Sequence, residues 1–224
     1  MIIEMRLSGF LFLFILVLQI AMAAFGYILE PTPKHYESDA KLIKFNEYPK
    51  KFQIGVVLAL IEHFSVITLP IMLFLAFSQY NIILGIFWAI FRIAEGAIQV
   101  YIEKDYWGLL DIAKKYSVTS GTEKNSLRDS YRSILQTKST RFAFAMIFWS
   151  IGTLAFSILL VTYEVVPPFI GWIGIVATIP VGIGNVMKLV KPNIKFFELL
   201  SSIGGLLPII FEVLIGGWLL FFSQ

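Results

Sequence analysis

Long apolar runs separated by shorter polar segments dominate the hydrophobic pattern of this chain. Each of six runs has about the length that an α-helix needs to cross a bilayer, roughly 20 residues at 1.5 Å per residue. The pattern therefore predicts an all-α fold, a polytopic transmembrane helical bundle that forms a single integral membrane domain over residues 1–224. We expect the six spanning helices at about residues 7–29, 53–78, 81–102, 142–163, 169–187 and 199–222.

The composition supports a bilayer as the solvent of this chain. Hydrophobic residues make up 58% of the sequence and charged residues 15%, against about 25% charged residues in a typical soluble domain. The chain has no cysteine. Disulfides, thiolate catalysis, iron–sulfur clusters and cysteine-based zinc sites are therefore excluded.

The basic residues predict the orientation of the chain in the membrane. Apart from Arg6 and Arg92, all Lys and Arg residues lie in the segments that follow the first, third and fifth predicted spans. Short loops rich in Lys and Arg stay on the cytoplasmic side, so both termini are expected outside. The first 24 residues also resemble a signal peptide with a small-residue site at 21–23. A lysine-rich segment follows and resists translocation, which favours an uncut first span.

The longest polar segment, residues 103–141, reads as two helical stretches separated by the sequence TSGTEKNS. In the second stretch, apolar residues gather on one side and basic residues lie nearby. This is the pattern of an amphipathic helix that lies in the membrane interface, and we expect such an interfacial cytoplasmic segment in contact with the lipid bilayer. The alternative is a docking surface for a cytoplasmic protein partner. The lipid interpretation is favoured because basic cytoplasmic faces are common in membrane proteins.

Several ionisable residues lie near the middle of the predicted spans. An exposed charge at the bilayer centre costs about 2.5–3.5 kcal/mol on insertion scales, so these side chains are expected to meet inside the bundle. We expect Arg92 to lie against carboxylates from neighbouring spans, with Glu62 as its first partner. The candidate ligand- or ion-binding residues are Glu62, His63, Arg92, Glu95, Gln99 and Glu212.

The spacing of these residues gives the third span a polar face. Arg92, Glu95 and Gln99 follow the pattern i, i+3, i+7 and therefore share one side of the helix. Gly96 lies beside them and allows another helix to approach closely. Three glutamates against one arginine leave an excess of negative charge. Protonated carboxyls, a charged His63 or a bound cation would each balance that excess.

Other kinds of chemistry find no support in the sequence. No lysine lies within a predicted span, which argues against a retinal-type Schiff base, and no His-Glu-x-x-His motif is present. We recognise no nucleotide-binding fingerprint, so we expect no cofactor, no metal site and no nucleic-acid partner. No nucleophile–base pair is visible, and the sequence does not indicate an enzyme.

Three segments resemble the bacterial and archaeal membrane family catalogued as domain of unknown function 4386. They read FWAIFRIAEGAIQV, VVPPFIGWIGIVATIPVGIG and GGLLPIIFEVLIGGWLLF. The resemblance implies a six-span architecture in a bacterial or archaeal cell membrane, with an activity that is itself unassigned. Glu95 stands where an amide is more usual in that family. The positions that match the family pattern are Arg92, Pro168, Gly171, Pro208, Glu212 and Trp218.

Two functions follow from these observations. The first is a membrane protein whose midplane charge cluster binds or conducts a proton, a cation or a small amphiphilic ligand, because buried ionisable residues in membranes mark such sites. The second is a non-catalytic membrane subunit or sensor. In that alternative the charges form a static hydrogen-bonded network, and the segment 103–141 contacts a partner.

Overall fold

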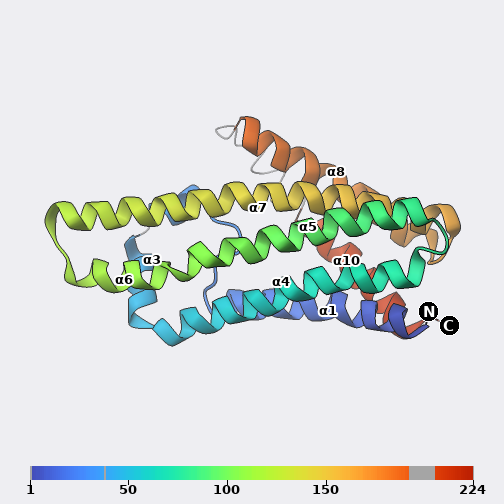
Figure 1. The fold of residues 1–224 in the computed structure, drawn as a ribbon, viewed down its shortest axis with the longest axis horizontal. Helices are drawn as coiled ribbons and strands as arrows, with labels where there is room; N and C mark the ends of the chain where they lie inside the picture. The colour runs from blue at the N-terminus through green and yellow to red at the C-terminus, as the bar shows by residue number, and fades with distance from the viewer. Residues whose placement is uncertain (1, 38, 192–204, 224) are drawn as a thin grey trace. The chain divides into compact units, whose positions relative to one another are not determined.

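The computed structural model describes residues 2–37, 39–191 and 205–223. Helices dominate this part of the chain, and no strand occurs in it. Figure 1 shows the helices in chain order. They are α1 (Ile2–Ala24), α2 (Pro33–Tyr36), α3 (Asp39–Glu47), α4 (Pro49–Phe77), α5 (Ile82–Trp107), α6 (Leu109–Val118), α7 (Gly121–Tyr163), α8 (Pro168–Val190) and α10 (Leu206–Phe221).

Five stretches of helix are long and apolar enough to cross a membrane. They are α1, α4, the run Ile82–Val118 that includes α5, and the helices α7 and α8. The helix α10 is equally apolar but has only 16 residues, and residues 199–204 of the predicted sixth span lie outside the described residues. These lengths and compositions fit an all-helical, multi-pass membrane protein.

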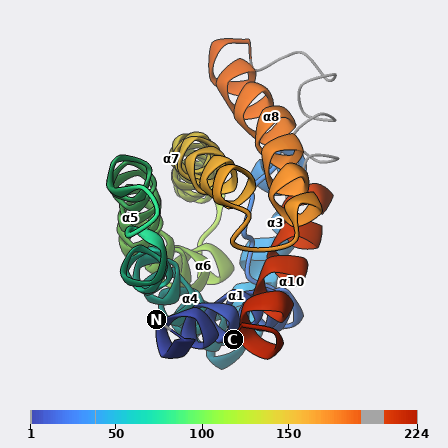
Figure 2. The same cartoon turned by 90° about the vertical axis from the view of Figure 1, so that its right-hand side faces the viewer.

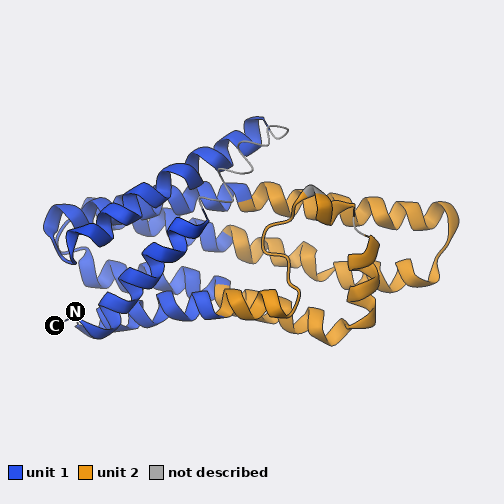
Figure 3. Ribbon diagram, turned by 180° about the vertical axis from the view of Figure 1, so that it is seen from behind, with its two compact units in different colours: residues 1–17, 63–97, 143–224 blue, residues 18–62, 98–142 orange. Residues whose placement is uncertain are grey.

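The described residues form two compact units, which Figure 3 colours separately. Unit 1 is drawn from residues 1–17, 63–97 and 143–224, and unit 2 from residues 18–62 and 98–142. Several long helices contribute residues to both units. The single membrane domain stays a prediction, and each unit is described by itself below.

In unit 1, side chains from α1, α4, α5, α7, α8 and α10 share one apolar core. Trp88 of α5 packs against Phe156 of α7, with ring centroids 4.4 Å apart. The helix α10 packs against α8 and also lies beside α1, as Figure 2 shows. At the α1–α10 crossing the backbones of Gly9 and Gly216 approach so closely that neither position has room for a Cβ atom.

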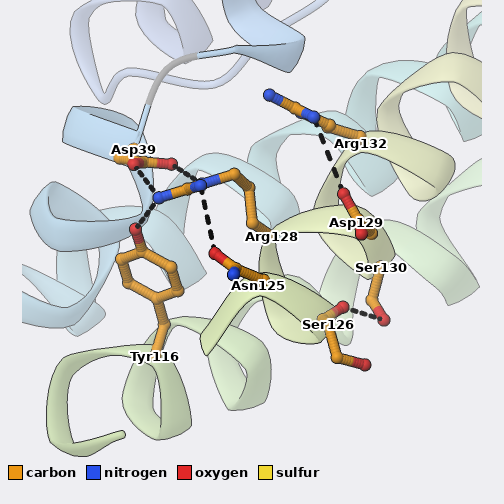
Figure 4. A network of polar contacts seen from close by, with 8 residues as sticks. All are labelled: Asp39, Tyr116, Asn125, Ser126, Arg128, Asp129, Ser130 and Arg132. Carbon is orange, nitrogen blue, oxygen red and sulfur yellow. Dashed lines mark hydrogen bonds and ion pairs between the residues drawn. The ribbon is translucent and has the colours of Figure 1, made fainter. Parts of the chain in front are cut away.

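In unit 2, α3 packs against α6, and the core contains Leu42 and Phe45 of α3 together with Tyr106 and Leu109. An ion pair ties α3 to α7. The Arg128 guanidinium donates two hydrogen bonds of 2.7 Å to the Asp39 carboxylate and a longer one to the Tyr116 hydroxyl (Figure 4). The hydrogen bonds from Arg128 hold the pKa of Asp39 below its usual value, because they favour the ionised carboxylate.

The amphipathic segment differs from the predicted interface-lying helix. The helix α7 begins at Gly121, whose φ of +67° turns the chain, and then continues without a break for 43 residues to Tyr163. Its apolar side chains Tyr131 and Leu135 are buried in the unit 2 core, and contact of the remaining surface with lipid stays a prediction. A helix of this length, about 65 Å at 1.5 Å per residue, exceeds the roughly 30 Å hydrocarbon core. Its polar first half therefore extends the predicted fourth span.

Candidate functional site

Unit 1 contains a buried arginine, Arg92, which is paired with a buried glutamate. Arg92 and Glu95 both lie on α5, and their side chains are only 8% and 3% exposed. The Arg92 Nη1 donates to the Glu95 Oε2 at 2.5 Å, so an i, i+3 pair on one helix neutralises the charge. The two residues share a helix face as their spacing predicts, and Glu95 is the partner of Arg92 that the structure describes.

The Arg92 side chain packs against Trp149 and Gly152 of the helix α7. The guanidinium carbon of Arg92 is 5.9 Å from the ring centroid of Trp149, within the range of a cation–π interaction. One turn further on, Gly152 leaves room for the arginine stem, because a Cβ atom there would lie 2.8 Å from the Arg92 Cγ. Sequence reasoning missed both residues. Gly152 is a small residue in a predicted span, a type enriched at helix–helix contacts, but its sequence position does not show which helix it faces.

A second carboxylate, Glu212 of α10, reaches the same region of unit 1. The Trp149 Nε1 lies 3.4 Å from the Glu212 Oε1, a long hydrogen bond. Arg92 and Glu212 both line a cavity of about 10 Å³. The other lining residues are Phe12, Leu69, Leu73, Trp88, Thr153, Phe156 and Phe211. A volume of this size accommodates about one water molecule.

The remaining predicted residues divide between the two units. His63 belongs to unit 1 and is 2% exposed. A Cβ atom at Gly96 would lie 2.5 Å from the Ile67 Cγ1 and 3.4 Å from the His63 carbonyl oxygen. The close approach of another helix at Gly96 is thereby confirmed, and the approaching helix is α4.

Glu62 and Gln99 are buried in unit 2. Glu62 accepts a hydrogen bond of 2.9 Å from the Gln19 Nε2. The structure therefore brings Arg92, Glu95 and Glu212 together within unit 1, and it describes Glu62 beside Gln19 in unit 2. The pairing of Glu62 with Arg92 stays a prediction.

Unit 2 contains a second buried ion pair that the sequence did not reveal. Lys138 of α7 and Glu103 of α5 are each 3% exposed, and the Lys138 Nζ lies 3.6 Å from the Glu103 Oε1. Both residues fall in the segment assigned to the cytoplasm, where charges are ordinarily solvated. The heptad spacing of Tyr131 and Lys138, with Leu135 between them, placed all three on one helix face and could have indicated burial.

The described residues also contain no group of three His, Cys, Asp or Glu side chains that could hold a metal ion. The described helices and their composition fit the class of all-helical, multi-pass membrane proteins, here with the buried ion pairs Arg92–Glu95 and Lys138–Glu103. The family described as "Domain of unknown function (DUF4386)" matches residues 7–222. The chain belongs to this family, which confirms the resemblance seen in the sequence. No curated protein and no solved structure matches the chain.

Proposed function

We propose that the chain crosses a bacterial or archaeal cell membrane six times, with both termini outside. The sixth span contains α10, which packs against α8 and crosses α1 at glycine positions, as a helix of the same bundle does. The orientation is supported by the Lys and Arg residues, which concentrate in three of the connecting segments.

Cysteine labelling tests this orientation directly, because the natural chain has no cysteine. Glu164, between α7 and α8, and Glu123, in the first turn of α7, are both exposed. In intact cells we expect a membrane-impermeant maleimide to label Glu164→Cys and to leave Glu123→Cys unlabelled until the membrane is permeabilised. Labelling of both variants in intact cells, or of Glu123→Cys alone, would contradict the proposed topology.

The activity supported best is the binding and conduction of a proton, or of a small cation in its place, at the unit 1 site formed by Arg92, Glu95 and Glu212. The observation that carries this proposal is the charge ratio around the site. Two carboxylates accompany a single guanidinium, and Glu95 already holds that guanidinium at 2.5 Å. Low-dielectric surroundings raise the free-energy cost of a second negative charge at this site, and a proton or a small cation bound at Glu212 would lower that cost.

The size of the cavity narrows the class of ligand. A space of about 10 Å³ has room for one water molecule and none for an amphiphilic molecule. A proton needs no additional space, because it adds only an O–H bond to a carboxylate. Among the ligands considered for this site, a proton therefore fits the described geometry best.

Proton uptake into proteoliposomes tests the proposal. With a pH-sensitive dye inside the vesicles and an imposed proton gradient, the wild type is expected to give faster acidification than empty vesicles. Glu212→Gln is expected to lose most of that excess, because the amide keeps the shape of the side chain but cannot exchange a proton at neutral pH. The matched control is Glu47→Gln, which makes the same change at an exposed position of α3 and should leave uptake unchanged.

The alternative function predicts a different outcome for the same variants. If the charge network is structural, wild-type vesicles acidify no faster than empty ones, and Glu212→Gln changes only the unfolding temperature. The chain would then be a non-catalytic membrane subunit or sensor. The protein partner would be sought at the exposed, hydroxyl-rich start of α7, within the cytoplasmic segment 103–141.

A further inference from the structure

The buried lysine of unit 2 sits in a cage of aromatic rings. The Lys138 Nζ lies 4.0 Å from the ring centroid of Tyr27 and 3.8 Å from that of Tyr106. The same ammonium donates a hydrogen bond of 2.6 Å to the Tyr27 hydroxyl. The Tyr27 hydroxyl in turn donates a short hydrogen bond to Glu103. The ammonium thus lies against the Tyr106 ring, at the hydroxyl edge of Tyr27 and beside the Glu103 carboxylate.

The walls of this cage are fixed independently of the lysine. The rings of Tyr27 and Tyr106 meet edge to face with centroids 5.0 Å apart. The Ile28 backbone N–H donates to the Tyr106 hydroxyl at 3.2 Å, which orients that ring. Phe52 of α4 also packs against Tyr106, with ring centroids 5.5 Å apart. Three segments that are distant in sequence therefore build the cage, and Lys138 enters it from α7.

This arrangement matches the chemistry by which proteins recognise ammonium groups. Aromatic faces attract a cation through their quadrupoles, and the attraction grows when the cation is shielded from water. A primary ammonium also has three donors, which suit a hydroxyl and a carboxylate on one side. Hard metal cations such as Mg²⁺ and Ca²⁺ require several oxygen ligands at about 2.0–2.6 Å. Here the cation lies 3.6 Å from the Glu103 Oε1 and is otherwise surrounded by aromatic rings and one hydroxyl, which suits an ammonium group better than a metal ion.

The charges around the cage favour a cation at this position. Glu103 is buried beside the ammonium, and its Oε1 lies 3.6 Å from the Lys138 Nζ. Closer to the surface, Arg141 donates to Asp105 at 2.6 Å, and both of these side chains are partly exposed. That outer pair is already neutral, and Glu103 forms the buried ion pair with the caged ammonium of Lys138.

We propose that Tyr27, Tyr106 and Glu103 form a binding site for small primary ammonium ions, which the ammonium of Lys138 occupies as a tethered ligand. In the wild type Lys138 fills the cage, so a free alkylammonium ion can enter it only when the lysine side chain is absent. Removal of the lysine side chain leaves a vacant site whose carboxylate draws in a cation. The site lies in unit 2 and uses none of the residues proposed for proton binding, so failure of either proposal leaves the other standing.

Chemical rescue of Lys138→Ala tests this assignment in the full-length protein. n-Propylammonium replaces the atoms that the substitution removes, and thermal unfolding in detergent or nanodiscs is the readout. At saturating n-propylammonium chloride we expect the midpoint of Lys138→Ala to rise by about 3 °C or more over sodium chloride at equal ionic strength. The wild type should show no such difference. The matched control is Lys114→Ala, which removes an exposed lysine and should not respond to the amine.

Three further measurements test which features of the cage the amine needs. Tetramethylammonium carries the same charge but has no N–H donor, so it should rescue Lys138→Ala less than n-propylammonium does. The double variant Lys138→Ala/Glu103→Gln should lose the response, because its cage no longer carries a buried negative charge. Lys138→Met keeps the stem as far as Cε and should respond to the ammonium ion itself, which is the one group that the substitution removes.

Several outcomes would overturn the assignment. A folded Lys138→Ala that responds equally to sodium, tetramethylammonium and n-propylammonium has no ammonium site. An undiminished response in the double variant shows that the amine binds elsewhere. If neither Lys138→Ala nor Lys138→Met folds even when produced and purified with the amine present, the cage cannot accept a free ammonium ion and the proposal fails.

Discussion

Replacing Arg92 with methionine is expected to lower the free energy of unfolding by about 3–5 kcal/mol, the cost of removing one partner of a buried ion pair. Methionine has nearly the length of the arginine stem, so packing against Gly152 changes little and the loss is mainly electrostatic. Glu95 would keep its burial without the guanidinium that lies 2.5 Å away in the wild type. Titration with SDS in mixed micelles measures the change.

A double-mutant cycle separates charge from packing in this prediction. Glu95→Gln in the Arg92→Met background removes the uncompensated carboxylate, so the double variant should recover much of the lost stability. The matched control is Arg132→Met. Arg132 lies on α7, its side chain is 45% exposed, and it pairs with the exposed Asp129 of the same helix. That control should change stability by about 0.5 kcal/mol or less. Equal losses in both arginine variants would show that Arg92 is not buried as described.

The apolar runs predicted most of the helices. A helix that crosses a bilayer needs about 20 consecutive apolar residues, and runs of that length can be recognised directly in the sequence. Five helical stretches of the described residues meet that length, and each overlaps one predicted span, although α7 begins well before residue 142 and α1 ends at Ala24. The segment TSGTEKNS, residues 119–126, differs from its prediction. Its Gly and Asn residues indicated a long break, whereas the structure needs only a turn at Gly121 before α7 begins. Positive φ at a single glycine is a conformational choice that composition does not reveal.

Contacts within one helix were easier to predict than contacts between helices. The spacing of Arg92 and Glu95 placed both side chains on one face, since 3.6 residues per turn is a property of the backbone. Which neighbouring helix faces Arg92 depends on the rotation of each helix, and no local rule sets that rotation. Trp149 and Gly152 therefore escaped notice, and Glu62 was preferred as a partner on charge alone.

The buried pair of Glu103 and Lys138 escaped for a different reason. Its residues lie outside the predicted spans, and the prediction assigned such charges to water. In the structure, α5 and α7 continue past the ends of those spans and pack together in unit 2. Burial of a charge there follows from the pairing of two helices, which the positions of the apolar runs do not encode.

Substitution of Gly9 by alanine is expected to destabilise the protein by about 3 kcal/mol, at the upper end of what overpacking costs. An added Cβ atom would lie 2.5 Å from the Leu220 amide nitrogen and 2.7 Å from the Gly216 carbonyl oxygen. Both are backbone atoms of α10, so no side chain can rotate away to make room. The helices α1 and α10 would have to separate along their crossing, which costs the close packing that drives helix association in lipid.

Gly217→Ala is the matched control for this prediction, because it adds the same methyl group to α10 one residue beyond the crossing. No heavy atom lies within 4 Å of that added Cβ, so stability should stay within about 1 kcal/mol of the wild type. Thermal unfolding of both variants in nanodiscs decides the matter. A Gly9→Ala protein as stable as Gly217→Ala would mean that α1 and α10 do not cross as described. The main support for α10 as part of a sixth spanning helix would then be lost, and with it the position of Glu212 beside Arg92.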